Sequence, residues 1–317
     1  EAAFSIENLY SRADILNPIG KDEWDIIEVK SSTEVKENHI QDVSFQKYTY
    51  QKAGLNIRKC FLMHINNKYV RTGKVNAKDL FKVEDVTSDV NKAINGIQDR
   101  ISLMFQIINS KTCPKIENGK SCEGPKECPL QDICWDFLPK DNIFSLYRAG
   151  NKVRELFERS IYSINEIPKE FKLSDKQQLQ KECVKSQKPH IDKVAINNFL
   201  KSLKYPIHYL DFETFSTVIP LYDGTKPYQQ IPFQFSLHIQ ESEKLNPIHF
   251  YFLASGKIDP REEFLTELKK VIRDNGTILV FNQTFEVSRL KELAEEFPIQ
   301  KKWIKSILER IADLLMP

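Results

Sequence analysis

The stretch IHYLDFETF, residues 207–215, is an apolar run that carries an Asp-x-Glu pair near its end. Such a run predicts a buried β-strand, and the alternation of a strand places Asp211 and Glu213 on the same face. Two carboxylates in this relation can bridge a pair of divalent cations about 4 Å apart. Because a strand this apolar should be central in its sheet, we expect its end to open at a crevice.

Outward from this strand, the last third of the chain alternates between the two types of secondary structure. The apolar patterns predict strands at 207–213, 233–239, 248–253 and 277–281, and helices at 260–275 and 285–296. This order, βββαβα, indicates a mixed sheet with helices packed on it. Asn282 and Glu286 follow the fourth strand, at the start of the second helix.

The N-terminal part carries a second α/β pattern. We expect a hairpin at 2–16, a buried strand at 24–30, a helix at 39–53 and another strand at 56–65, followed by a long helical stretch at 83–110. Short connections and alternating element types place this part, too, in the α/β class.

Polar residues gather at the end of the strand at 24–30. Strand alternation points Glu28 and Lys30 to one face, and Asp14 joins them if the hairpin pairs with this strand. Two carboxylates can hold a hard divalent cation, while a lysine beside them can orient water or stabilise charge on a phosphate. Gln46 and Tyr50 are four residues apart on the following helix, so they share one face and could flank the same site.

Four of the six cysteines, Cys113, Cys122, Cys128 and Cys134, fall in one loop rich in Pro and Gly. Thiolates at these spacings can satisfy a tetrahedral zinc ion or an iron–sulfur cluster, and unligated thiols remain a third interpretation. A clustered set in a long, otherwise cysteine-poor chain is typical of a metal site rather than a disulfide scaffold. This usage favours a reducing, cytoplasmic location.

Composition limits the classes of function. The 317 residues carry 46 Lys plus Arg against 44 Asp plus Glu, so a uniformly basic surface for nucleic acid is excluded and any such contact must be a local patch. No apolar run approaches the roughly 18 residues of a membrane span, so no membrane contact is expected. We expect domains at 1–140 and 205–317, joined by a helical connector at 141–204.

The first set of residues resembles the RecB type of PD-(D/E)XK nucleases. The marks of that family are an Asp, an E-x-K strand end and a Q-x-x-x-Y helix, which read here RADIL, IIEVKSS and FQKYTY. The resemblance implies that Asp14 and Glu28 bind Mg²⁺ or Mn²⁺, that Lys30 positions water or stabilises charge, and that Gln46 and Tyr50 orient substrate or Lys30. Ala13 stands where the family has proline, and the family's upstream helix with a metal-binding His would lie before Glu1.

Some RecB-type nucleases carry an iron–sulfur cluster on cysteines that follow the Q-x-x-x-Y helix. The four cysteines of this chain resemble that arrangement, with Cys113 taking the place of a ligand that in the relatives comes from before the nuclease core. The resemblance implies a structural [4Fe-4S] cluster, with zinc as the alternative.

The second set resembles the DEDD 3′→5′ exonucleases, which have a ribonuclease H-like fold. Asp211 and Glu213 match their first motif, and Asn282 with Glu286 matches the second in form, Glu286 standing where Asp is usual. The resemblance implies that Asp211, Glu213 and Glu286 bind metal and that Asn282 organises the site. The family's third motif would lie beyond Pro317, so this domain is expected to be incomplete, and Asp313 is expected in a structural role.

The order of the three motifs resembles a family of bacterial proteins that combine a RecB-like nuclease, a cysteine cluster and a DEDD-like exonuclease. We therefore expect a two-domain, metal-dependent nuclease that hydrolyses DNA, in preference to RNA, at ends or on single strands. Protein partners in DNA repair or defence are compatible with this function. The alternative is a catalytically impaired nucleic-acid-binding or scaffold protein with a structural metal or iron–sulfur site.

Overall fold

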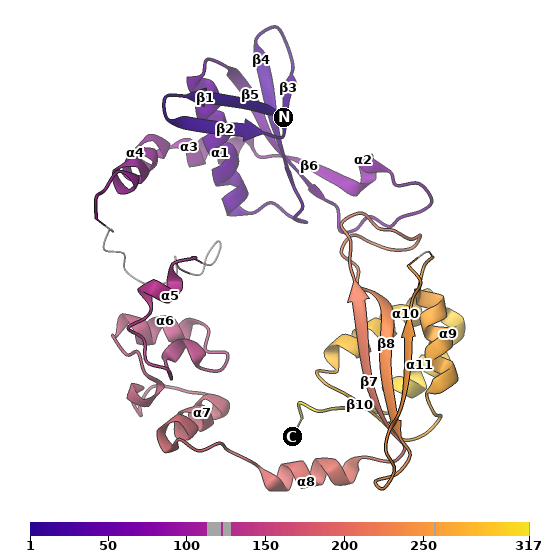
Figure 1. Ribbon diagram of the computed structural model, residues 1–317. Helices are drawn as coiled ribbons and strands as arrows, with labels where there is room; N and C mark the ends of the chain where they lie inside the picture. The colour runs from indigo at the N-terminus through magenta and orange to yellow at the C-terminus, as the bar shows by residue number, and fades with distance from the viewer. Residues whose placement is uncertain (113–121, 123–127, 257, 317) are drawn as a thin grey trace. The chain divides into compact units, whose positions relative to one another are not determined.

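The computed structural model describes residues 1–112, 122, 128–256 and 258–316, and these residues form a mixed α/β structure (Figure 1). The chain divides into two compact units. Unit 1 contains residues 1–97 and 193–317, and unit 2 contains residues 98–192. Unit 1 holds two larger sheets with separate hydrophobic cores, while unit 2 is built from helices.

The N-terminal part of unit 1 is a four-stranded mixed sheet with a hairpin beside it. The hairpin consists of β1 (Ala2–Ile6) and β2 (Leu9–Ala13). The sheet has the order β3-β4-β5-β6, with β3 (Ile15–Pro18), β4 (Glu23–Lys30), β5 (Asn56–Ile65) and β6 (Phe81–Asp85). Helix α1 (Glu37–Lys52) crosses over between β4 and β5, which is why these two strands are parallel.

Burial of one face of α1 holds this part together. Val43 and Tyr50 of the helix are fully buried against Ile26 of β4 and Cys60 of β5. The two short helices α2 (Ala77–Leu80) and α3 (Thr87–Ile94) flank β6, and Val90 of α3 completes the same core. The predicted strands at 24–30 and 56–65 and the predicted helix at 39–53 are confirmed.

Two predictions in this region are wrong in detail. The stretch 83–110, expected as one long helix, is divided into three elements. Residues 83–85 belong to β6, because residues 81–85 pair antiparallel with β5. The rest forms α3 and α4 (Ile97–Ile108), which are separated at Gly96, whose φ is 72°. The hairpin expected at 2–16 ends at Ala13. Beyond Asp14 the chain enters β3 of the four-stranded sheet, whose Leu16 pairs with Ile26 of β4.

Unit 2 is helical within the described residues. Its elements after α4 are α5 (Gln131–Cys134), η2 (Ile143–Ser145), α6 (Asn151–Glu158), η3 (Ile164–Glu166) and α7 (Asp175–Ser186). The predicted helices at 151–160 and 174–187 are confirmed, and Ser174 caps α7 by accepting a hydrogen bond from the Gln177 amide. A small core gathers around Leu156 and Ile164, both fully buried.

The C-terminal part of unit 1 is a five-stranded sheet with the order β11-β10-β7-β8-β9. Its elements are α8 (Lys193–Ser202), β7 (Ile207–Phe215), β8 (Ile231–Gln240), β9 (Ile248–Leu253), α9 (Arg261–Val271), β10 (Thr277–Val280), α10 (Thr284–Glu296), η4 (Pro298–Gln300), α11 (Lys301–Leu308) and β11 (Ile311–Asp313). The predicted order βββαβα is confirmed.

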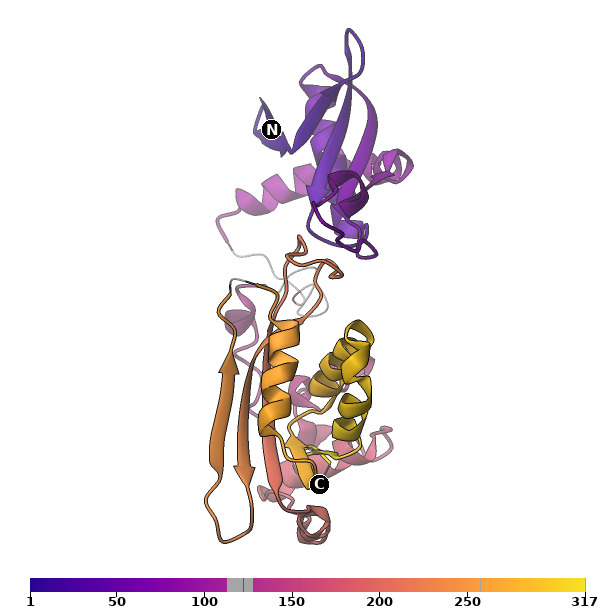
Figure 2. The same ribbon diagram turned by 90° about the vertical axis from the view of Figure 1, so that its right-hand side faces the viewer.

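Strand β7 is central in this sheet, as its apolar sequence predicts. It pairs antiparallel with β8 and parallel with β10, and the helices α9, α10 and α11 pack on one side of the strands (Figure 2). Leu210 and Phe212 of β7 point into the core beneath these helices, where Phe212 contacts Phe264 of α9 with ring centroids 5.0 Å apart. The alternate residues of β7, Asp211 and Glu213, are exposed on the opposite face.

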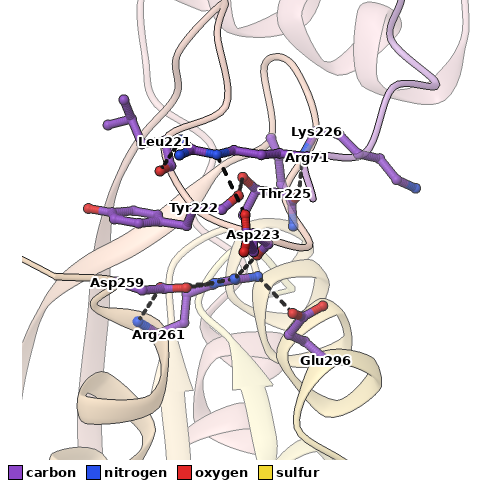
Figure 3. Close-up of polar contacts among 10 residues, drawn as sticks. Arg71, Leu221, Tyr222, Asp223, Thr225, Lys226, Asp259, Arg261 and Glu296 are labelled. Atoms are coloured by element: carbon purple, nitrogen blue, oxygen red, sulfur yellow. Dashed lines mark hydrogen bonds and ion pairs between the residues drawn. The ribbon is translucent and has the colours of Figure 1, made fainter. Parts of the chain in front are cut away.

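Within unit 1, the loop after β5 contacts the loop after β7 (Figure 3). The Arg71 amide donates to the Thr225 carbonyl at 3.0 Å, and the Gly224 amide donates to the Arg71 carbonyl at 2.9 Å. The Gly73 amide adds a hydrogen bond of 2.8 Å to Asp223 Oδ1. The two loops are therefore joined through backbone amides as well as through the Arg71 guanidinium, which donates to the Pro220 carbonyl at 2.9 Å.

Gly224 is required by this contact. Its φ is +75°, and a Cβ at this position would lie 2.6 Å from Glu296 Oε1 at the end of α10. Arg261 lies beside it, 4% exposed in its side chain, and forms ion pairs with Asp259 at 2.7 Å and Glu296 at 3.5 Å. Arg261 also donates to the Asp223 carbonyl at 3.0 Å, so the loop is tied to both α9 and α10.

Candidate functional site

The end of β4 brings together the residues of the first motif. Glu28 is 6% exposed, and both of its carboxylate oxygens are engaged. Oε1 accepts a hydrogen bond from Lys30 Nζ at 2.7 Å, and Oε2 accepts one from Gln46 Nε2 at 2.8 Å. Strand alternation places Glu28 and Lys30 on one face, and the parallel crossover through α1 brings Gln46 over them.

Asp14 lies beside this group, at the bend between β2 and β3. Its Oδ2 accepts a hydrogen bond of 2.8 Å from the Val29 amide, the residue between Glu28 and Lys30. The chain therefore places a second carboxylate next to the strand end, as the motif spacing predicts. Asp14 lies at the bend where the chain leaves the hairpin and enters the four-stranded sheet, and this bend brings its side chain to β4.

Tyr50 is fully buried, and its hydroxyl is used by the backbone. It donates to the Ala2 carbonyl at 2.6 Å and accepts from the Ala13 amide at 2.6 Å. Tyr50 thus ties α1 to both strands of the hairpin and acts on the site through α1. Proline at position 13 would lack the N–H that donates to the Tyr50 hydroxyl.

Sequence reasoning missed Asp42. This residue of α1 accepts a hydrogen bond from Lys30 Nζ at 2.6 Å, so the ammonium group lies between Glu28 and Asp42. Burial alone would lower the pKa of Lys30, but the hydrogen bonds to Asp42 and Glu28 outweigh it and raise the pKa. The available signal was spacing, since Asp42 and Gln46 are four residues apart and share the helix face that covers β4.

His39, one turn before Asp42, is a second polar residue that the motif did not include. It is 8% exposed, and its Nδ1 accepts a hydrogen bond of 3.2 Å from the Lys36 amide. Burial, followed by the positive charges of Lys30 and Lys36, lowers its pKa. A neutral imidazole therefore borders the charged group around Lys30.

The second group of acids lies near the end of β7. Because β7 and β10 are parallel, the residues after β10 reach the same end of the sheet as Asp211 and Glu213. Glu286 of α10 is 3% exposed, and its Oε2 has no hydrogen-bond partner among the described residues. Burial raises its pKa, and the negative charges of Asp211 and Asp313 raise it further.

Asp313 shapes the turn that carries Asn282. It accepts backbone hydrogen bonds from Asn282 at 2.9 Å, Gln283 at 3.0 Å and Leu315 at 3.0 Å. Burial opposes ionisation of this carboxyl, but these amide hydrogen bonds outweigh it and hold its pKa below the usual value. Asn282 has a φ of 62°, a conformation that Asn adopts more readily than most residues. Asp313 thus has the structural role expected of it, fixing the start of α10.

Three of the four clustered cysteines, Cys122, Cys128 and Cys134, are among the described residues. The Cys128 amide donates to the Cys122 carbonyl at 2.9 Å, and Cys134 ends α5. Cys113 lies outside the described residues. Cys60 is a buried core residue whose burial raises its pKa to about 12, so it is an inert thiol.

Both acidic sites offer oxygen atoms to a metal ion, although neither forms a complete set of ligands among the described residues. Within the part of the chain that the structure describes, no three His, Cys, Asp or Glu side chains are arranged to hold one metal ion. Each acidic site nevertheless contains a buried oxygen without a partner among the described residues, Gln46 Oε1 in the first and Glu286 Oε2 in the second. Amide and carboxylate oxygens are the donors that Mg²⁺ and Mn²⁺ prefer, directly or through bound water.

Comparison with known proteins gives a family match for the second sheet. Residues 208–317 match the family described as a domain of unknown function, DUF2779. Two curated relatives are similar: Uncharacterized protein MG366 of Mycoplasma genitalium, 33% identical over 138 residues, and its homologue in Mycoplasma pneumoniae, 31% identical over 134 residues. Each alignment covers 38% of this chain and 20% of the relative, so the chain spans about a fifth of the relatives' length. No solved structure is significantly similar to the chain.

No helix among the described residues has the length and apolar character needed to cross a membrane.

Proposed function

We propose that this chain is a Mg²⁺- or Mn²⁺-dependent nuclease of the cytoplasm that hydrolyses DNA at ends or on single strands. The observation that carries the proposal is the convergence of Asp14, Glu28, Lys30 and Gln46 on the end of one central strand. These residues come from three separate segments of the sequence, because Glu28 and Lys30 share β4, and phosphodiester hydrolysis needs this combination of carboxylates and a cation.

In the first site, Asp14 and Glu28 would hold the metal ion. The bound ion would supply a Lewis acid for the phosphate and lower the pKa of an attacking water. Lys30 remains protonated beside Glu28 and Asp42, so it supplies positive charge for the phosphate rather than removing a proton. Gln46 fixes the Glu28 carboxylate through Nε2 and leaves Oε1 free to accept a hydrogen bond from water.

In the second site, Asp211, Glu213 and Glu286 would hold metal, with Asn282 and Asp313 fixing the start of α10. The buried Glu286 carboxylate, close enough to Asp211 and Asp313 to feel their charges, favours a cation as its missing partner. Three antiparallel strands followed by two parallel ones support a ribonuclease H-like domain here. The cysteines would form a structural iron–sulfur or zinc site, whose four-thiolate ligand set leaves no open position for chemistry.

The test is cleavage of single-stranded DNA by the full chain, purified without oxygen and assayed with Mg²⁺, Mn²⁺ or EDTA. Glu28→Gln and Asp211→Asn should each remove part of the metal-dependent cleavage, and the double variant should remove all of it. Glu243→Gln, a change at an exposed carboxylate between β8 and β9, is the matched control. A circular strand of the same sequence reports whether ends are required.

The same preparation should be analysed for iron, sulfide and zinc and by its absorption spectrum. About four irons per chain with a broad band near 400 nm would support the cluster. Cleavage that is unaffected by both single variants and by the double variant would refute the nuclease proposal. The chain would then be better described as a nucleic-acid-binding or scaffold protein.

A further inference from the structure

Unit 2 contains a cavity that neither acidic group involves. Its volume is about 660 Å³, within the range of small-molecule sites, and its walls come from α5, η2 and the start of α6. Three aromatic side chains, those of Trp135, Phe144 and Phe157, line it. The ring centroids of Trp135 and Phe144 lie 4.1 Å apart with an interplanar angle of 31°, and Phe144 and Phe157 lie 5.7 Å apart. Such a wall favours a flat, aromatic ligand.

Two polar atoms in this wall are buried and have no partner among the described residues. They are Gln131 Oε1, an acceptor, and Trp135 Nε1, a donor. The two residues are four apart across α5, so they lie on one side of this helical turn and both line the cavity. Buried polar atoms are rarely left unpaired, so a ligand that presents a donor and an acceptor on one edge would satisfy both once the two side chains turn toward it. Nucleobases carry such an edge.

Positive charge borders the same cavity. Arg148 and Arg154 both line it. Arg154 uses Nε for its ion pair with Glu158 at 2.9 Å, which leaves its two terminal nitrogens available to a second anion. The Arg148 side chain packs over the Tyr147 ring, with the guanidinium carbon 5.4 Å from the ring centroid.

The start of α6 adds to this charge. The helix begins at Asn151, and its preceding residue, Gly150, provides no side-chain cap. Gly150 and Asn151 line the cavity, so the N-terminal end of the helix dipole faces an anion placed there. Arginines combined with a helix N-terminus are a common phosphate-binding arrangement.

We propose that this cavity binds a nucleotide, with the base on the aromatic wall beside Gln131 and Trp135 and the phosphate at Arg154, Arg148 and the start of α6. The nucleotide can be a free mononucleotide or the terminal nucleotide of a strand, since both present the same base and phosphate. The site is independent of the nuclease proposal, because it shares no residue with either acidic group.

The probe is AMP, titrated into the full chain in EDTA so that no cleavage can occur. Binding is followed by calorimetry and by tryptophan fluorescence, which is informative because the chain has only three tryptophans. We expect saturable binding with a fluorescence change. Trp135→Phe should abolish that change, whereas Trp303→Phe should retain it.

Arg154→Ala should weaken AMP binding at least tenfold and leave adenosine binding unchanged, because adenosine has no phosphate. Arg159→Ala is the matched control, since Arg159 forms a similar exposed ion pair with Glu155 but does not line the cavity. Circular dichroism melting checks that each variant is folded. A 5′-phosphorylated oligonucleotide that binds more tightly than AMP would identify a strand end, and equal or weaker binding would identify a free nucleotide. No AMP binding, or binding by folded Trp135→Phe and Arg154→Ala variants that is unchanged in signal and affinity, would overturn the proposal.

Discussion

Gln46 holds Glu28 in place across 18 residues of sequence, through a hydrogen bond of 2.8 Å from its side-chain amide to Glu28 Oε2. Both residues are buried, with exposed fractions of 3% and 6%. The bond joins the helix that covers the sheet to the strand that carries the candidate metal ligand. The geometry of the first site therefore depends on how α1 packs as well as on the strand itself.

Gln46→Ala should lower both stability and cleavage. The change leaves Glu28 Oε2 buried without its donor, and a hydrogen bond to a charged group contributes about 2 kcal/mol. Urea denaturation should show a loss of this size, together with a fall in kcat at saturating Mg²⁺. Gln41→Ala, at an exposed position of the same helix, should change neither quantity. Equal behaviour of the two variants would contradict the role given to Gln46.

Tyr50→Phe should destabilise the N-terminal sheet while leaving the charged groups of the site in place. It removes the hydroxyl that joins Ala2 and Ala13, leaving the Ala13 amide without its acceptor at a cost of about 1–3 kcal/mol. Ala13→Pro removes the other half of the contact and should destabilise similarly. Tyr10→Phe, at an exposed tyrosine, is the control. The midpoint of unfolding in urea is measured for the three variants. An unchanged midpoint in Tyr50→Phe would show that the Tyr50 hydroxyl does not stabilise the sheet through Ala2 and Ala13.

Asp42→Asn should flatten the loss of stability at alkaline pH through its effect on Lys30. Because the folded pKa of Lys30 is raised above its ordinary value of 10.5, the stabilisation is fully present below that value and is lost as pH rises through the folded pKa. The Asn variant lacks the charge that holds Lys30 protonated, so its stability should fall less steeply above pH 10.5. At neutral pH it should lose about 0.2–1 kcal/mol, since both groups are partly exposed.

The comparison variant for Asp42→Asn is Asp89→Asn, which breaks an ion pair between two exposed side chains, Asp89 and Lys92. Denaturation at a series of pH values should leave the alkaline slope of that variant unchanged. If Asp42→Asn keeps the slope of the unaltered protein, Asp42 does not hold Lys30.

Glu286→Gln should flatten the pH dependence of stability on the acidic side. The folded pKa of Glu286 is raised, so the folded state retains its proton longer than the unfolded state, and stability falls as pH rises from the unfolded value through the folded one. Glutamine has no proton to lose and removes this fall. Mg²⁺ should raise the melting temperature of the unaltered protein and raise it less in the variant. A pH profile unchanged by the substitution would contradict the raised pKa of the buried Glu286.

Gly224→Ala should destabilise unit 1 more than an alanine at another glycine of the same conformation. Gly224 and Gly256 have φ values of +75° and +76°, but only at Gly224 does a Cβ meet another residue, Glu296 Oε1 at 2.6 Å. Both variants should lose about 1–2 kcal/mol from the left-handed backbone, and Gly224→Ala should lose more. Denaturation measures the difference, and equal losses would show that the loop can move away from α10.

Hydrophobic patterning located most of the secondary structure. The strands β4, β5, β7, β8, β9 and β10 and the helices α1, α6, α7, α9 and α10 are predicted within a few residues of their observed bounds. The exceptions occur where backbone pairing with a distant segment competes with local preference. Residues 83–85 have helical spacing but lie in β6, because β5 offers hydrogen-bond partners that periodicity does not reveal.

The sequence by itself determined which residue types stand at the strand ends, because alternation in a strand and the four-residue repeat of a helix assign side chains to faces. This was enough to group Glu28 with Lys30, Asp211 with Glu213, and Gln46 with Tyr50. Only the tertiary structure decided what each group contacts. Asp42 beside Lys30, the Tyr50 hydroxyl on Ala2 and Ala13, and Asp313 beneath Asn282 all join segments that meet only after the sheets form. Local spacing fixes the direction of a side chain, whereas its partners depend on long-range packing.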